Sequence, residues 1–496
     1  MLAKAISAAV LGVEAFEVQI EVDIANGLPS ITTVGLPDTA VQESKERVRA
    51  AIKNAGYPFP ASRIVINLAP ADIRKEGPAF DLPIALAVLS AQGIIPEKVL
   101  QETVISAELA LDGSLRAVRG AINIGLFAVK RGIKNVLVPP ANAAEVAVFG
   151  DLNVYAPKNL LEAIRFLRGE MGLEPAQPET LRAEEDFLDF QDVKGQVLAK
   201  RALEIAAAGG HNILFTGPPG SGKTMLARRL PGILPLLERD EAIEVTQIHS
   251  TAGALKQSGL VQSPPFRAPH HTVSDAGLIG GGNIPKPGEV SLAHRGILFL
   301  DEFPEFSRRA LEVLRQPLED GIVTISRAKA SLTFPARFML VASQNPCPCG
   351  YYGDKGKVCS CSPVQRQRYQ DRISGPLLDR IDLRVTVPRL TADELVQAST
   401  GEATTTIRQR VIAARQKALE RQETPNAYLQ GRALRKHVEL SPASERFAKA
   451  MTNQLGLSAR SYDRLLRVSR TIADLANDKT VTETHLAEAV SYRGML

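Results

Sequence analysis

A glycine-rich stretch at residues 217–224 has the spacing of a phosphate-binding loop. It reads Gly217, Pro218, Pro219, Gly220, Ser221, Gly222, Lys223 and Thr224. An apolar run precedes it and a helix-forming run follows, so its backbone N–H groups can surround a phosphate at a helix N-terminus. Lys223 would reach the β- and γ-phosphates of a nucleotide, and the Thr224 hydroxyl would bind Mg²⁺. The alternative is a glycine-rich turn that binds nothing, and the flanking runs disfavour it.

Two further apolar runs end in polar side chains that suit the same chemistry. Residues 297–302 read ILFLDE, so a buried strand should deliver Asp301 and Glu302 at its carboxyl end, where open α/β sheets bind ligands. Asp301 suits a carboxylate that holds Mg²⁺, and Glu302 one that polarises the attacking water. The next apolar run ends in Asn345, which can position that water. Each run alone could be a strand that ends in a solvated loop, but their order behind the glycine-rich loop favours the catalytic interpretation.

All four cysteines fall within the short segment CPCGYYGDKGKVCSC, at Cys347, Cys349, Cys359 and Cys361. Four thiolates can complete a tetrahedral zinc site, and the intervening glycines allow a tight loop. Four free thiols or disulfides are the alternatives, and disulfides are disfavoured in the cytosol. We expect a structural zinc ion here.

Composition sets outer limits on the function. The 496 residues are 45% hydrophobic and 23% charged, which excludes wholesale disorder. No apolar run reaches the ~20 residues of a membrane span, and the first residues lack a convincing signal-peptide cleavage site. We therefore expect a cytoplasmic protein without a membrane partner.

Positive charge is concentrated at the C-terminal end. Residues 401–496 hold 16 basic and 10 acidic side chains, whereas the other 400 residues hold 43 and 44. A basic region can face a polyanion such as DNA, although helical domains also acquire such a balance by chance. With no Trp and 5% aromatic residues, base stacking is disfavoured as the main binding mode.

Periodicity divides the chain into regions and predicts a multidomain α/β protein. Residues 1–168 mix strands such as EVQIEVDI with amphipathic helices such as SKERVRAAIKNAG, an α+β pattern. Residues 169–189 read as a linker, with two prolines and dense charge. Residues 190–390 alternate strands, glycine-rich loops and helices, as a parallel sheet does. Residues 391–496 are helical by period.

These motifs, together with the stretch FRAPHHTVSDAGLIGGGNIPKPGEVSLAHRGILFLDE, resemble the magnesium-chelatase-like AAA+ ATPases. The whole chain resembles the ComM (YifB) family. That resemblance implies an N-terminal Lon-protease-like domain of the ribosomal-S5-domain-2-like fold, a P-loop AAA+ core and a helical C-terminal lid. It makes the glycine-rich loop Walker A, Asp301 and Glu302 Walker B, and Asn345 sensor 1.

The resemblance also indicates residues that complete an ATPase site and touch a substrate. GPLLDRIDL points to Arg380 as an arginine finger, for which a salt bridge to a nearby acid is the alternative. LSARSYDRLL points to Arg460 as the sensor 2 residue. Residues 251–290 match an insertion of related helicases. GIVTISRAKASLTF alternates as a hairpin does, with Arg327 and Lys329 near its turn to contact DNA phosphates in a ring pore, unless it is an ordinary surface hairpin.

The N-terminal region lacks the residues that a Lon-type protease needs. By resemblance, the position of the catalytic Ser holds Ala79 and that of the catalytic Lys holds Ile122. A Ser–Lys dyad needs both a hydroxyl and a desolvated amine. Proteolysis through that dyad is therefore excluded, and an ATP-dependent protease is disfavoured.

The resemblance implies an ATP- and Mg²⁺-dependent ring motor, a homohexamer, on single-stranded or branched DNA. Its activity would be that of a helicase or branch-migration ATPase in the recombination of incoming DNA during natural transformation. The competing hypothesis is a chelatase-type or chaperone-like motor that remodels a protein partner. The core motifs suit both, and the Lon-like domain argues against a chelatase motor subunit.

Overall fold

The computed structural model describes residues 1–72, 75–178, 187–255, 259–282, 285–327, 330–354, 356–391, 394 and 401–493. The chain divides into two compact units. The first combines Met1–Arg182 with Arg239–Val261, and the second combines Ala183–Glu238 with Gln262–Leu496. Among the described residues, no helix is both long and apolar enough to cross a membrane.

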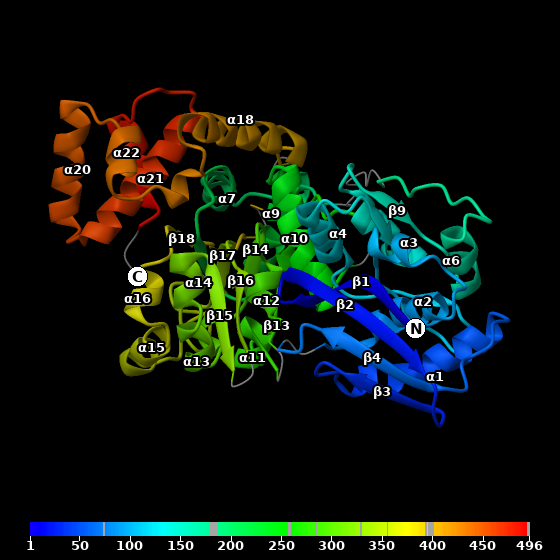
Figure 1. Ribbon diagram of the computed structural model, residues 1–496. Helices are drawn as coiled ribbons and strands as arrows, with labels where there is room; N and C mark the ends of the chain where they lie inside the picture. The colour runs from blue at the N-terminus through cyan, green and yellow to red at the C-terminus, as the bar shows by residue number, and fades with distance from the viewer. Residues whose placement is uncertain are drawn as a thin grey trace. The chain divides into compact units, whose positions relative to one another are not determined.

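The first unit is built on a seven-stranded mixed sheet in the order β3-β4-β2-β1-β5-β8-β9 (Figure 1). Antiparallel pairing joins β1, β2 and β4, and the other neighbours pair in parallel. The strands are β1 (Leu2–Leu11), β2 (Glu14–Ala25), β3 (Ser30–Val34), β4 (Arg63–Ala69), β5 (Thr103–Ile105), β8 (Asn135–Leu137) and β9 (Asn153–Tyr155). A two-stranded ribbon, β6 (Glu108–Leu109) and β7 (Leu115–Arg116), accompanies them.

Local sequence explains these elements. Alternating burial along β2 and β4 puts one face of each strand in the core, as a period of two requires. The Asp38 side chain caps α1 by accepting from Val41 N at 2.8 Å, and Gly56 with φ 85° follows its end. The helices are α1 (Thr39–Asn54), α2 (Asp81–Ala91), α3 (Glu97–Gln101), α4 (Ala121–Arg131), α5 (Pro140–Ala147) and α6 (Leu160–Leu167). The predicted α+β alternation is confirmed.

One helix of the first unit comes from far along the chain. Helix α10 (Arg239–Ala252) follows the glycine-rich loop in sequence, yet it packs beside α4 (Figure 1). The buried side chain of Asn123 donates to Thr251 Oγ1 at 2.9 Å and accepts from Gln247 Nε2 at 2.8 Å. Ser250 Oγ accepts from Gly120 N at 2.9 Å. The second compact unit therefore lacks part of the predicted core at residues 190–390, namely Arg239–Val261. Helix α10 belongs to the first unit because its side chains satisfy polar groups at the start of α4.

The second unit contains a five-stranded sheet in the order β11-β14-β17-β10-β18. All its neighbouring strands pair in parallel, which confirms the predicted parallel sheet. The strands are β10 (Ile213–Thr216), β11 (Phe266–Arg267), β14 (Ile297–Leu300), β17 (Met339–Gln344) and β18 (Leu383–Thr386). Strands β14 and β17 are buried along their whole length, as expected of a parallel sheet covered on both faces.

The connections of this sheet carry short elements. Helix α7 (Val197–Gly209) precedes β10, the first strand of the sheet. The connections between strands hold α8 (Lys223–Ala227), α9 (Leu230–Ile233), α11 (Asp275–Ile279), α12 (Glu289–Leu292), α13 (Arg308–Glu312), α14 (Arg315–Asp320), α15 (Pro363–Gln370) and α16 (Gly375–Leu378). Two antiparallel ribbons also occur, β12 (Gly280–Gly281) with β13 (Lys286–Pro287), and β15 (Ile322–Arg327) with β16 (Ala330–Pro335). The second ribbon confirms the predicted hairpin.

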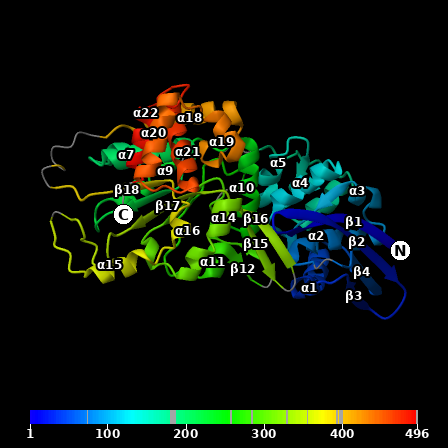
Figure 2. The ribbon, with the colours of Figure 1, turned by 90° about the vertical axis from the view of Figure 1, so that its left-hand side faces the viewer.

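The C-terminal region is helical, as predicted, but it shares a core with the sheet. Its helices are α18 (Thr404–Gln422), α19 (Gly431–His437), α20 (Pro442–Gln454), α21 (Ala459–Leu475) and α22 (Glu483–Ser491). Figure 2 shows α18, α21 and α22 beside α7, and both α18 and α21 pack on α7. One hydrophobic cluster runs from Ile205 of α7 through Val385 of β18 to Ile472 of α21.

Candidate nucleotide-binding site

The glycine-rich loop connects β10 directly to α8. Strand β10 ends at Thr216 and α8 begins at Lys223, so the loop spans the six residues expected to surround phosphate. A Cβ on Gly217 would lie 2.1 Å from the carbonyl oxygen of Val387. Gly220 and Gly222 have φ of 77° and 92°, which side-chain-bearing residues rarely adopt. The glycines are therefore required by the path of the backbone.

The side chain of Lys223 is held inside the loop. Its Nζ donates to the carbonyl oxygens of Gly217 at 2.6 Å and Pro218 at 3.0 Å. A third donation, to Asn345 Oδ1 at 3.3 Å, joins Walker A to the predicted sensor. Burial lowers the pKa of the Lys223 ammonium from its ordinary value, opposed by attraction to Asp301 and Glu302.

The carboxylate of Asp301 connects the loop to two strands. Thr224 Oγ1 donates to Asp301 Oδ2 at 2.7 Å, and the Ser343 hydroxyl donates to Asp301 Oδ1. The hydroxyl and carboxylate expected to hold Mg²⁺ thus lie side by side, a donor set that suits this hard cation. Sequence reasoning did not identify Ser343. The feature that could have revealed it is its hydroxyl, two residues before Asn345 and near the end of the strand that pairs with β14.

A cavity of about 450 Å³ opens over these residues. It is lined by Pro219, Gly220, Ser221, Gly222, Lys223, Thr224, Met225, Asp301, Glu302, Ser343, Gln344 and Asn345. The predicted Walker A, Walker B and sensor 1 residues therefore meet in one place. Backbone donors, an ammonium, a hydroxyl and carboxylates around one cavity fit a magnesium-bound nucleoside triphosphate.

The two predicted arginines lie in a different cavity of the same unit. Arg380 and Arg460 both line a space of about 840 Å³, and neither lines the cavity over the glycine-rich loop. Arg380 forms an ion pair with Glu319 and donates to the carbonyl oxygen of Pro376 at 2.7 Å. Arg460 is exposed in the first turn of α21. Within one chain, the structure does not bring these side chains to the phosphate site.

Two further arginines line the larger cavity, and sequence reasoning missed both. Arg464 and Arg467 follow Arg460 on α21, and this spacing places all three on one helical face. Arg464 pairs with the buried Asp382 at 3.4 Å, and burial lowers the pKa of its guanidinium. The spacing of arginines at i, i+4 and i+7 could have revealed this basic face.

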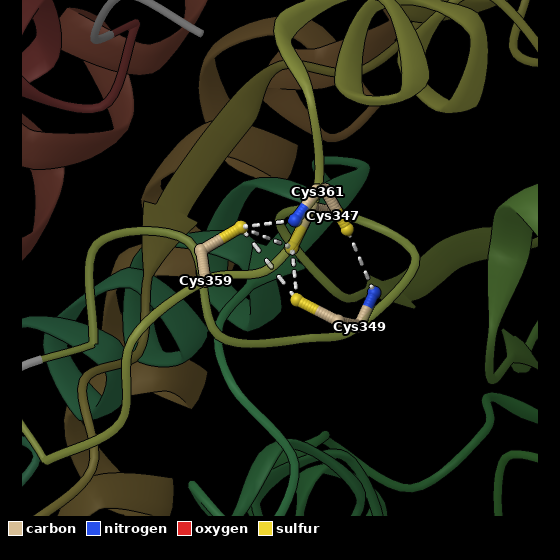
Figure 3. Close-up of side chains that lie close together, drawn as sticks. All are labelled: Cys347, Cys349, Cys359 and Cys361. Carbon is tan, nitrogen blue, oxygen red and sulfur yellow. Dashed lines mark hydrogen bonds between the residues drawn. The ribbon is translucent and has the colours of Figure 1, made fainter.

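The four cysteines converge, as Figure 3 shows. Their sulfur atoms all lie within 4.8 Å of one another, and three pairs are separated by 3.4, 3.6 and 3.7 Å. Zn–S bonds of about 2.3 Å put the sulfurs of a regular tetrahedron about 3.8 Å apart, whereas a disulfide needs about 2.0 Å. All four cysteines are free thiols. The cluster can hold a metal ion.

The cysteine loop contacts the glycine-rich loop. A Cβ on Gly350 would lie 2.7 Å from Pro219 Cδ, and Gly350 has φ of 86°. The loop also begins two residues after Asn345. Backbone donation from Tyr351 lowers the pKa of Cys349 to about 5, whereas burial raises that of Cys347 to about 12.

The remaining predicted residues lie outside these cavities. Arg327 is exposed at the end of β15, whereas Lys329 lies outside the described residues. Ala79 sits in a short turn of 3₁₀-helix (Pro78–Phe80), where its carbonyl oxygen accepts from Ala107 N at 3.1 Å. Ile122 is fully buried in α4. Both side chains are hydrocarbon, so neither position offers a nucleophile or a base.

Comparison with known proteins identifies the class. Three family models match: "Magnesium chelatase, subunit ChlI" over residues 189–395, "Subunit ChlI of Mg-chelatase" over 20–142, and "Magnesium chelatase, subunit ChlI C-terminal" over 401–493. With the parallel sheet and the nucleotide cavity, they define a magnesium-chelatase-like AAA+ ATPase that uses ATP and Mg²⁺.

Full-length relatives narrow the class to a family. The chain is 47% identical to "Uncharacterized protein YifB" of Salmonella typhimurium, covering 98% of this chain and 96% of that protein. It is 46% identical to "Competence protein ComM" of Haemophilus influenzae, covering 100% and 98%. The "Magnesium-chelatase 38 kDa subunit" of Acidiphilium rubrum is 27% identical, covering 60% and 87%. The chain belongs to the ComM/YifB family.

Proposed function

We propose that this protein is an ATP-driven, ring-forming DNA motor that acts as a helicase or branch-migration ATPase. Its role would be recombination of incoming DNA during natural transformation. The competence name of the Haemophilus influenzae relative supports that setting. The proposal combines a nucleotide site, a means of sharing it between subunits and a surface for DNA.

The proposal that the subunits form a ring rests on the separation of the two cavities. Arg380 and Arg460 line one cavity, and the phosphate-binding residues line another. An arginine at the γ-phosphate stabilises charge in the transition state and can raise the rate 10³- to 10⁵-fold. In a closed ring, each subunit would supply its arginine cavity to the nucleotide of its neighbour. We propose a closed ring on this basis, and the family resemblance suggests that it is a homohexamer.

Charge supports DNA as the substrate. In the hairpin of β15 and β16, Arg327 is exposed as the last residue of β15, and residues 401–496 carry an excess of six positive charges. Hydrogen bonds from such side chains to phosphates position a duplex or a single strand without reading its sequence. In this proposal, the hairpin contacts DNA in the ring pore.

Steady-state ATP hydrolysis tests the proposal. The rate is measured alone and with single-stranded, forked and four-way DNA at several salt concentrations, with Lys223→Ala as the blank. We expect stimulation that is lost in the blank and falls steeply with salt, since phosphate contacts release counterions. Hydrolysis that no DNA changes at low salt would reject the DNA motor. It would favour a chelatase-type motor on a protein partner, which the family models also suit.

We further propose that Cys347, Cys349, Cys359 and Cys361 bind a structural Zn²⁺ ion. The donor set of four sulfurs and their spacing support it. The ion would complete its coordination with protein ligands, so it would act by fixing the loop and not by activating water.

A further inference from the structure

A histidine to which the sequence motifs assign no role lies beside the Walker B carboxylate of Glu302. Strands β11 and β14 are parallel neighbours, paired Phe266 with Ile297 and Arg267 with Leu298. Segments that follow the carboxyl ends of parallel neighbours emerge at the same edge of the sheet. Glu302 follows β14, and His271 follows β11. The topology thus brings residues that are 31 positions apart to the same edge.

The two side chains are in contact. His271 Nδ1 lies 3.2 Å from Glu302 Oε2. Glu302 itself is in the left-handed region with φ of 53°, a conformation that non-glycine residues adopt at a cost. Its side chain is 54% exposed, although Glu302 also lines the nucleotide cavity. An exposed carboxylate on a single flexible stem needs a partner to hold one rotamer.

His271 is itself fixed by its surroundings. Its ring lies 4.1 Å from the ring of His270 and 6.5 Å from that of Phe306, measured between centroids. Before it, Arg267 pairs with both carboxylate oxygens of Glu289, at 2.6 and 2.7 Å. After it, the Ser274 side chain caps α11. The segment that carries His271 is therefore anchored at both ends.

The far end of this segment is also tied to the Walker B side of the sheet. Asp275, the first residue of α11, forms a 2.8 Å ion pair with Arg309 of α13. Helix α13 follows Glu302 by only a few residues. The imidazole thus has the restricted freedom that a positioning group needs.

We propose that His271 is a positioning residue for Glu302, holding one oxygen of its carboxylate so that the other can accept a proton from the attacking water. This inference rests on the proposed ATP hydrolysis. In that step the water gives its proton to Glu302, its oxygen bonds to the γ-phosphorus, and the bond from that phosphorus to the β-phosphate oxygen breaks. His271 is not among the residues that line the nucleotide cavity. It acts through Glu302.

The test compares two neighbouring histidines. His271→Ala is expected to lower kcat about tenfold, the loss of one oriented contact in the transition state, with nucleotide affinity unchanged. His271→Asn keeps an N–H donor and should recover part of the loss. His270→Ala is the neighbouring control: its ring nitrogen bonds Thr272 and not Glu302, so removing this ring, which packs on His271, should lower kcat less than removing His271 itself. Single-turnover phosphate release and binding of a fluorescent ATP analogue separate chemistry from affinity.

A double variant shows whether the effect passes through the carboxylate. With Glu302→Gln already present, adding His271→Ala should change the residual rate less than twofold, since residues that act as one unit are not additive. An equal loss in His270→Ala and His271→Ala, or full additivity with Glu302→Gln, would overturn the proposal. All readouts use ATP without DNA, so failure of DNA stimulation affects only the proposed substrate. If wild type itself releases no phosphate, the proposed hydrolysis fails first.

Discussion

At the scale of single residues, Asp301 is the point where the nucleotide site is assembled. Two hydroxyls donate to its carboxylate, Thr224 from the start of α8 and Ser343 from β17. Each hydroxyl takes a different oxygen, so the carboxylate plane is fixed from two sides. A carboxylate held in this way would be ready to bind Mg²⁺ together with the Thr224 hydroxyl.

Replacing Ser343 should therefore weaken the use of Mg²⁺. Hydrogen bonds to charged groups contribute roughly 1.5–3 kcal/mol, so Ser343→Ala should raise the Mg²⁺ concentration for half-maximal ATP hydrolysis roughly tenfold. Titration of Mg²⁺ at saturating ATP measures this. Ser291→Ala is the control, since the Ser291 hydroxyl is also buried but has no hydrogen-bond partner in the described structure. Equal Mg²⁺ requirements in the two variants would contradict the role given to Ser343.

The site residues that the sequence predicts belong to a local motif, whereas those that it does not predict depend on contacts between distant segments. Residues 217–224 form a contiguous motif whose spacing alone specifies a loop between strand and helix. Ser343 and His271 matter only through their contacts with Asp301 and Glu302, and those contacts depend on the order of strands in the sheet. A serine or histidine in a sequence has no local signature of that order.

At the scale of elements, the cysteine loop joins the end of β17 to α15. It lies between Asn345 and the capping box of α15 at Ser362, and Gly350 packs against Pro219. A metal ion in this loop would hold Asn345 and the glycine-rich loop in register. Clustered cysteines predicted the convergence of the four sulfurs, because loop closure brings the pairs together whatever the surrounding fold.

Metal removal tests that role. Wild type should contain about one zinc per chain, and the double variant Cys359→Ser, Cys361→Ser should lose it, because two thiolates bind zinc far less tightly than four. We expect a lower melting temperature and slower ATP hydrolysis in the double variant. Elemental analysis and thermal unfolding measure both changes.

Two single variants allow the zinc site to be tested even if the double variant does not fold. Cys361→His preserves a zinc ligand and should retain the metal. Ser360→Ala lies between the two cysteines, is exposed and should match wild type. Wild-type protein that is free of zinc when purified without chelator, or zinc retained by the double variant, would contradict the site.

Helix α10 is the element that sequence periodicity could not assign. Its sequence follows the glycine-rich loop, so proximity along the chain favoured the ATPase core. Within the described part of the chain, the buried side-chain amide of Asn123 bonds Thr251 and Gln247, both of α10. Burying an amide without hydrogen-bond partners is costly. The hydrogen bonds to Asn123 therefore favour packing of α10 against α4. The Lon-like identity of the first unit stays a prediction.

At the scale of the whole molecule, the arginines set the requirement for assembly. Glu319 neutralises Arg380 in the single chain, and α21 places three arginines on the wall of the same cavity. Each nucleotide site would remain without an arginine until a second subunit approaches. Isolated subunits should then hydrolyse ATP slowly, and the rate per subunit should rise with protein concentration as rings form.

Mixing two inactive variants distinguishes a shared site from a site within one chain. Lys223→Ala lacks the phosphate-binding amine and Arg380→Ala lacks the finger, so each alone should be nearly inactive. In random mixed rings, a competent site pairs the intact Lys223 of one subunit with the intact Arg380 of its neighbour. An equal mixture should therefore recover about a quarter of the wild-type rate. If both residues served the same chain's nucleotide, no mixture would recover activity. Size-exclusion chromatography of the mixture, with Lys223→Ala plus Arg380→Ala in one chain as the control, separates failed catalysis from failed assembly.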